Sequence, residues 1–178
     1  GNVEVIPRGG VQFTSAGSGM SHREYNHSHT EPVHLLQMWV SPNQRDLEPT
    51  YETCIFSEEE KLNKVRILSK PRFINKIVTV VQIITAKTEH KDSSLKAIGI
   101  NQDVKVFASL LEKGKDVTYR PARGRYLYVH VCDTGGKISV NDVELEAGDG
   151  AFIRDIKEEI QITGASDSTA EFLLFDLA

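Results

Sequence analysis

Four of the six histidines in this chain, His22, His27, His29 and His34, lie in one short segment that follows a glycine-rich turn. Imidazole side chains are largely neutral near pH 7 and bind divalent transition metals well, especially beside a carboxylate. Glu24 supplies such a carboxylate two residues after His22. This segment is therefore where the sequence predicts metal chemistry.

The spacing of His22 and Glu24 is the strongest signal in the segment. In an extended chain, residues two apart face the same side, so both side chains would point into one cavity. A His-x-Glu pair is also frequent by chance, so the spacing alone leaves their role as ligands open. His27 and His29 are also two residues apart, but they lie among polar residues before a proline, which favours an exposed loop.

The remaining histidines have simpler interpretations. His34 opens an apolar run, so we predict a core or half-buried histidine hydrogen-bonded to the backbone. His90 lies in a polar stretch and His130 in a β-branched stretch, so we expect a loop residue and a strand residue, respectively.

Short β-branched and aromatic runs separated by turn residues dominate the chain, a pattern typical of antiparallel sandwiches and barrels. The predicted strands cover residues 11–14, 33–40, 77–84, 104–111, 125–131, 137–140, 151–153, 160–163 and 170–175. Helical periodicity is scarce, and the best helix start is Ser57, with Glu60 at the reciprocal position of a capping box. The sequence thus predicts a mainly β protein in which residues 20–32 connect two strands.

The composition sets limits on the class of protein. A chain of 178 residues with 39% hydrophobic and 26% charged residues is sufficient for one compact domain or two small ones. A net charge of -4 and a pI near 5.9 give no positive field, so we expect no direct nucleic-acid binding. No stretch approaches the ~20 apolar residues of a membrane-spanning helix, so we expect no membrane insertion.

Two smaller groups of residues receive ordinary interpretations. Cys54 and Cys132 have neither C-x-x-C spacing nor the density of a disulfide scaffold, so we expect free thiols in a reducing compartment. Arg120, Arg123 and Arg125 form a basic group that could be an anion or partner site, but solvated arginines in a turn before a strand are the favoured interpretation.

Several segments of the chain together resemble a known family. Residues 12–26, 30–40 and 49–52 look like the second metal-binding motif of the pirins, which belong to the cupin superfamily, and Gly19, His22 and Asn26 match the cupin pattern Gly-x-x-His-x-x-x-Asn. The downstream half is also similar to pirins, at residues 100–103, 124–131, 140–141, 147–150 and 170–177. The resemblance covers nearly the whole chain and is most specific in its first half.

The resemblance implies a fold and a division into domains. Pirins have two cupin-type β-barrels, each a double-stranded β-helix or jelly roll. Residues 1–62 would be a partial N-terminal metal-binding barrel, and residues 63–178 a complete, metal-free C-terminal barrel. We expect an insertion or an extra strand at about residues 72–90, where an apolar stretch departs from the pirin pattern.

The resemblance also implies a metal and two of its ligands. Pirins bind Fe(II) through three histidines and one glutamate, and His22 and Glu24 correspond to two of these. The other two belong to an upstream His-x-His motif, whereas residues 1–21 contain no histidine. We therefore expect this chain to lack roughly the first sixty residues of a pirin. It would then hold no complete iron site, and would self-associate through exposed barrel edges.

Two classes of function follow from the resemblance. In the first, the intact protein is an iron-dependent dioxygenase that acts on flavonols such as quercetin, a small aromatic substrate, with Glu24 as ligand and proton acceptor. In the alternative, it is a nuclear cofactor whose iron site modulates binding to a transcription factor. We expect the chain as it stands to be inactive, and a cytoplasmic or nuclear location.

Overall fold

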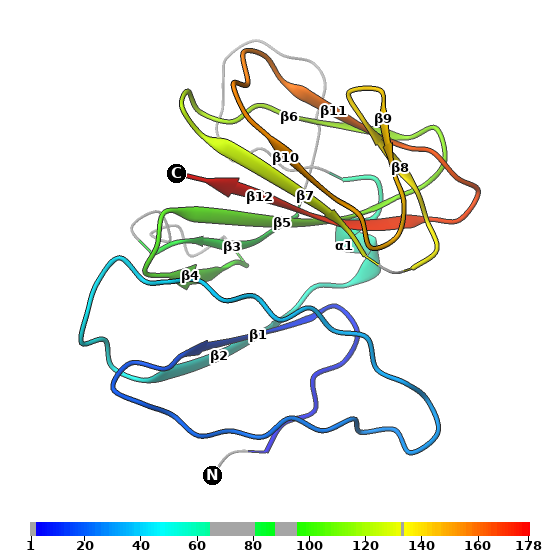
Figure 1. The fold of residues 1–178 in the computed structure, drawn as a ribbon. Coiled ribbons are helices and arrows are strands. Elements are labelled where there is room, and N and C mark those ends of the chain that lie inside the picture. The colour runs from blue at the N-terminus through cyan, green and yellow to red at the C-terminus, as the bar shows by residue number, and fades with distance from the viewer. Residues whose placement is uncertain (1–2, 65–80, 88–95, 133) are drawn as a thin grey trace.

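The computed structural model describes residues 3–64, 81–87, 96–132 and 134–178. Its strands form three sheets, and the predicted mainly β class is confirmed (Figure 1). The strands are β1 (Gly10–Ser15), β2 (Thr50–Ile55), β3 (Val81–Ala86), β4 (Ile98–Ile100), β5 (Val104–Leu111), β6 (Asp116–Tyr119), β7 (Tyr126–Val131), β8 (Ile138–Val140), β9 (Val143–Leu145), β10 (Gly150–Ile153), β11 (Ile160–Gly164) and β12 (Ala170–Leu177), with one helix, α1 (Glu58–Lys61).

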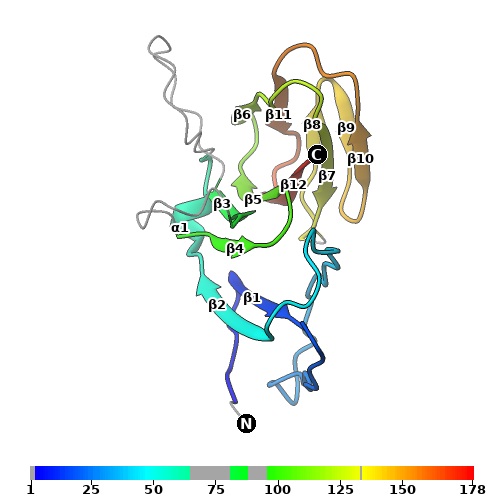
Figure 2. The same ribbon diagram turned by 90° about the vertical axis from the view of Figure 1, so that its left-hand side faces the viewer.

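The C-terminal part is a sandwich of two sheets. A six-stranded sheet has the order β10-β7-β12-β5-β3-β4, and a four-stranded sheet has the order β6-β11-β8-β9. Figure 2 shows the β6–β11 layer beside the β5–β12–β7 layer. The core between the sheets includes the fully buried side chains Leu111, Leu127, Val129, Val131, Ile138, Phe172 and Leu174.

Strand alternation explains why these side chains face inward. On β7, Leu127, Val129 and Val131 are 0% exposed, and the residues between them lie on the opposite face. The long β12 strand pairs with β5 over eight residues, from Ala170 opposite Leu111 to Leu177 opposite Val104. Because a slip of one residue would turn the apolar set to the wrong face, this register is strongly specified.

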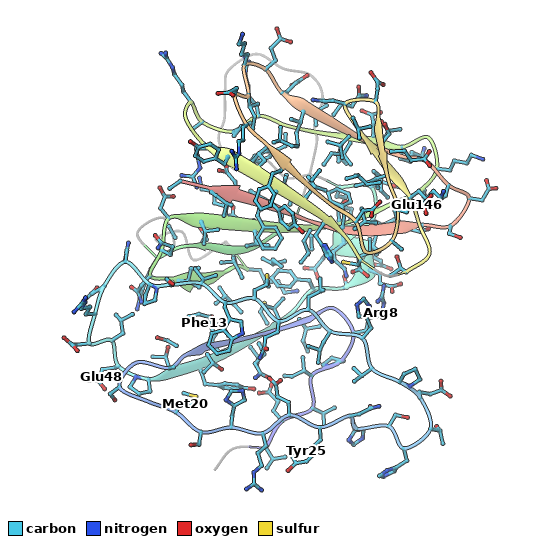
Figure 3. The ribbon with its side chains drawn as sticks, viewed as in Figure 1. Arg8, Phe13, Met20, Tyr25, Glu48 and Glu146 are labelled. Carbon is cyan, nitrogen blue, oxygen red and sulfur yellow. The ribbon has the colours of Figure 1, made fainter. Side chains whose placement is uncertain are left out.

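The hairpin of β1 and β2 covers the other face of the six-stranded sheet. Val11, Phe13 and Cys54 pack against a second core that includes Ile98 and Leu173. Figures 1 and 3 show the hairpin below the sandwich, with Phe13 on β1. The division at residues 62 and 63 stays a prediction, although both parts contribute side chains to this second core.

The predicted strand at residues 33–40 was wrong. The structure has no strand there, and the apolar side chains of Val33, Leu35 and Trp39 are 58%, 57% and 89% exposed. A segment with high strand propensity forms a strand only when it pairs with another strand. None of the described residues pairs with residues 33–40. The expected half-buried His34 is likewise exposed.

Most of the other strand predictions agree with the structure. Observed strands match or overlap the predicted ones at β1, β3, β5, β7, β8, β10, β11 and β12, whereas β2, β4, β6 and β9 were not predicted. Strand β3 lies between β5 and β4, so residues 81–86 are an integral part of the sheet. Residues 72–80 and 88–90 of the predicted insertion, including His90, lie outside the described residues.

The interpretation of the arginines was correct for two and wrong for one. Arg120 and Arg123 are exposed, whereas the Arg125 side chain is 13% exposed and forms ion pairs with Asp103 and Asp176. Asp176 is 2% exposed, so this pair is part of the packed structure.

Both cysteines are free thiols, as predicted. Burial raises the pKa of Cys132 to about 11. Within the described ranges, no helix has the length and apolar character that a membrane crossing requires.

The predicted capping box is present at α1. Ser57 Oγ accepts a hydrogen bond from the Glu60 backbone N–H, and the Ser57 backbone N–H donates to the Glu60 carboxylate at 2.7 Å. Lys96 Nζ donates to both carboxylate oxygens of Glu60 at 2.9 Å. Chiefly through the Lys96 hydrogen bond, and then through Ser57, these contacts lower the pKa of Glu60 to about 2.

A Glu60→Gln substitution tests this arrangement. Because the folded-state pKa is depressed, the contribution of Glu60 is complete above about pH 4.5 and is lost as the pH falls towards about 2. We expect the substitution to lower the free energy of unfolding at pH 7 by about 1 kcal/mol. The effect is small because the partly exposed pair is screened by solvent. Urea titrations at neutral and acidic pH should show this difference disappearing in acid, whereas Glu59→Gln should show no such trend.

Candidate metal site

The predicted metal-binding segment lies in a long loop between β1 and β2. Residues 16–49 contain no helix or strand, and the loop leaves β1 through Gly17 and Gly19. Gly17 has a φ of 51°, and a Cβ atom there would lie 2.2 Å from the carbonyl oxygen of Leu47. Only glycine allows the outgoing and returning chains to approach this closely. The turn therefore fixes the path of the segment that follows.

The loop brings His22 and Glu24 together, although its backbone is not a strand. His22 Nε2 lies 3.9 Å from Glu24 Oε1, and the two side chains are 50% and 45% exposed. Two ligand atoms that each lie about 2.1 Å from one metal ion can be at most about 4.2 Å apart. The separation of 3.9 Å lies within this limit, so both groups can contact one ion, and both are accessible from solvent.

The pair forms only part of a coordination shell. In the portion of the chain that the structure describes, no group of three or more His, Cys, Asp or Glu side chains is placed to hold a metal ion. A divalent transition metal bound by His22 and Glu24 would take its remaining ligands from water or from donors outside the described residues. The chemistry of the donor set, one imidazole and one carboxylate, suits iron, nickel or zinc.

The neighbouring histidines do not join the pair. His27 and His29 are exposed, as predicted for a loop. Asn26 shapes this loop, because its side chain accepts a hydrogen bond from the Ser28 N–H at 3.0 Å and donates to the Glu31 carbonyl at 2.7 Å. On β7, His130 lies near Tyr128, with the two rings stacked at 6.3 Å.

The outer face of the hairpin adds residues that the sequence prediction did not include. Gln12 on β1 donates a hydrogen bond from Nε2 to Glu24 Oε1 at 3.2 Å. Opposite Gln12 in the register is Thr53 on β2, whose hydroxyl donates to Glu4 Oε1 at 3.0 Å. Alternation of Gln12 and Thr14 with Val11 and Phe13 was the signal available in the sequence.

Tyr51 belongs to the same face and is held as a neutral phenol. Its hydroxyl donates to Glu4 Oε2 at 2.9 Å. Desolvation, followed by this hydrogen bond and the negative charges of Glu4 and Glu24, raises the pKa of Tyr51 above its usual range. The face therefore presents hydrogen-bonding groups beside the candidate metal ligands.

A groove of about 500 Å³ lies elsewhere, on the C-terminal sandwich. Its walls come from Ser139, Asn141, Asp142, residues 153–161 and Thr163. They include the charged side chains Asp142, Arg154, Asp155, Lys157, Glu158 and Glu159. An aromatic substrate is usually bound by a largely apolar pocket with a few polar groups, so this groove is a poor match for one.

Two mainly antiparallel sheets packed face to face are the layout of a jelly roll, the architecture found in cupins. The sequence matches the family described as "Quercetinase C-terminal cupin domain" over residues 86–177 and the family described as "Pirin" over residues 1–40. This chain belongs to the pirin family.

Individual relatives agree with this assignment. The chain is 32% identical to the quercetin 2,3-dioxygenase of Escherichia coli K12 over 99% of its own length and 64% of that protein. It is 31% identical to a putative quercetin 2,3-dioxygenase of Pseudomonas aeruginosa, over its whole length and 66% of that protein. The chain thus spans about two thirds of the length of these relatives.

Solved structures show the same likeness. The crystal structure of YhhW from Escherichia coli matches the whole chain and 64% of YhhW with a TM-score of 0.77 and 29% identity. A structure of YhhW, a bacterial pirin, in complex with nickel(II) matches with a TM-score of 0.74 and 29% identity, over 99% of this chain and 65% of that one. A relative of this chain therefore binds a transition metal.

Proposed function

We propose that His22 and Glu24 are ligands of a divalent transition metal, Fe(II) in the native protein, and that this centre serves the dioxygenation of flavonols such as quercetin. The observation that carries the proposal is the 3.9 Å separation of His22 Nε2 and Glu24 Oε1 on an accessible loop. The quercetin 2,3-dioxygenase names of its relatives and the nickel(II) complex of YhhW support it.

The side chains near the site have separate roles in this proposal. When bound, the metal would supply a Lewis acid with open positions for substrate and dioxygen. The Glu24 carboxylate would accept the proton of a flavonol hydroxyl. Among the described residues, only its Oε1 receives a hydrogen bond, so its Oε2 is open to that proton. The exposed position of His22 and Glu24 gives a flat aromatic substrate a way to approach.

Metal titration of variants tests the first half of the proposal. Titration calorimetry with Ni(II) should show that His22→Ala or Glu24→Ala weakens binding by roughly 100-fold, because each removes one of the two ligands. His29→Ala, in the same loop, is the matched control and should leave the affinity unchanged. Equal weakening by all three variants would contradict the assignment of these ligands.

Turnover of quercetin tests the second half of the proposal, the dioxygenase activity. Full-length protein loaded with Fe(II) should consume quercetin, as followed by its absorbance, and His22→Ala or Glu24→Ala should abolish the loss. The chain as it stands is expected to leave quercetin unchanged. Fully metallated full-length protein that leaves quercetin unchanged would contradict the dioxygenase role, but it would not contradict the proposed metal ligands. The alternative roles, a transcription cofactor with a protein partner and a nuclear location, stay predictions.

A further inference from the structure

Gln12 is the best-anchored side chain beside the candidate metal ligands. It lies in β1, which pairs with β2 in continuous register over six residues. His22 and Glu24, by contrast, lie on irregular backbone within residues 16–49. A group on a paired strand holds its position better than one on a loop, so the strand can orient the loop.

The hydrogen bond of Gln12 acts on the ligand itself. Its Nε2 donates to Glu24 Oε1 at 3.2 Å, and that same oxygen lies 3.9 Å from His22 Nε2. One amide donor occupies one acceptor position of the carboxylate and leaves the others available for a metal. The bond therefore limits how the carboxylate can turn without blocking it.

We infer that Gln12 is a positioning residue, whose amide holds the Glu24 carboxylate turned towards His22 so that both ligands face one ion. The inference rests on the proposed metal-binding function and adds a residue to it. Hydrogen-bond partners of metal ligands commonly raise metal affinity by about 10- to 100-fold. Gln12 has the contact and the rigid support that such a role requires.

The test compares Gln12→Leu with the wild type and with Gln161→Leu, a matched change at an exposed glutamine of β11. We expect Gln12→Leu to weaken Ni(II) binding by about 10- to 100-fold in titration calorimetry. Gln161→Leu should bind as the wild type does. The thermal midpoint of metal-free Gln12→Leu should equal that of the wild type, because Gln12 is exposed and its loss leaves no buried group unpaired.

A spectroscopic measurement separates positioning from a general structural effect. The visible absorption of bound Co(II) reports the geometry of its ligands, so Gln12→Leu should change that spectrum while Gln161→Leu should not. Equal Ni(II) affinity and equal Co(II) spectra for Gln12→Leu and wild type, with His22→Ala still impaired, would overturn the role of Gln12 alone. Wild-type protein that binds no Ni(II), or binds it equally well after His22→Ala, would overturn the proposed function as well.

Discussion

Replacing Glu171 by glutamine is expected to lower the free energy of unfolding by about 3–5 kcal/mol, because it leaves a buried ammonium without its anionic partner. Lys61 Nζ lies 2.7 Å from Glu171 Oε1, and the two side chains are only 3% and 13% exposed. The other oxygen of Glu171 accepts a hydrogen bond from Arg8 Nη2 at 2.9 Å. One carboxylate thus joins the segment before β1, helix α1 and strand β12.

Urea unfolding at neutral pH measures this effect, with Glu146→Gln as the matched control. Glu146 pairs with Lys137, and these side chains are 62% and 39% exposed. An exposed pair contributes at most about 1 kcal/mol, so the control should remain close to the wild type. If both variants lose the same amount of stability, the burial of Lys61 does not determine the effect of removing its partner.

Arg125→Ala is expected to destabilise the protein by about 3–5 kcal/mol, since it leaves the Asp176 carboxylate buried without its cation. Asp176 is 2% exposed and accepts hydrogen bonds from Arg125 Nε and from the Tyr119 hydroxyl. Arg125 Nη2 also donates to the Asp176 backbone carbonyl at 3.0 Å. The variant therefore removes several bonds that fix the end of β12.

Arg123→Ala is the control for this prediction, because Arg123 is exposed and lies two residues away in the same turn. A surface change of this kind usually stays within about 0.5 kcal/mol. Thermal unfolding of the two variants should therefore separate them clearly. Similar midpoints for both would contradict the structural role assigned to Arg125.

Local signals accounted for much of the fold. The bounds of β5 and the capping box of Ser57 and Glu60 were both predictable from neighbouring residues. The missed strands β6 and β9 are short and carry polar residues, so only their pairing partners make them strands. The same reasoning explains why residues 33–40 do not form a strand. Their strand propensity is high, but they pair with none of the described strands.

The residues of the candidate site were likewise only partly predictable from the sequence. The pair His22 and Glu24 could be found from residue type and a spacing of two, and the structure places the pair 3.9 Å apart. Gln12 could not be assigned to the site, because its contact with Glu24 depends on how the loop folds back over the hairpin. Tyr51 on β2 and Glu4, which precedes β1, are 47 residues apart, and their contact depends on how the N-terminal segment packs against the hairpin.

Residue types and short-range spacing were enough to predict the mainly β class, the capped helix and the histidine and glutamate that could bind metal. These features depend on backbone preferences and on residues a few positions apart, which the order of the chain encodes directly. The burial of Arg125 and the pairing of Lys61 with Glu171, which are 110 residues apart, became evident from the folded arrangement alone. Burial and charge pairing depend on which distant segments pack together, and no local pattern of residues records that.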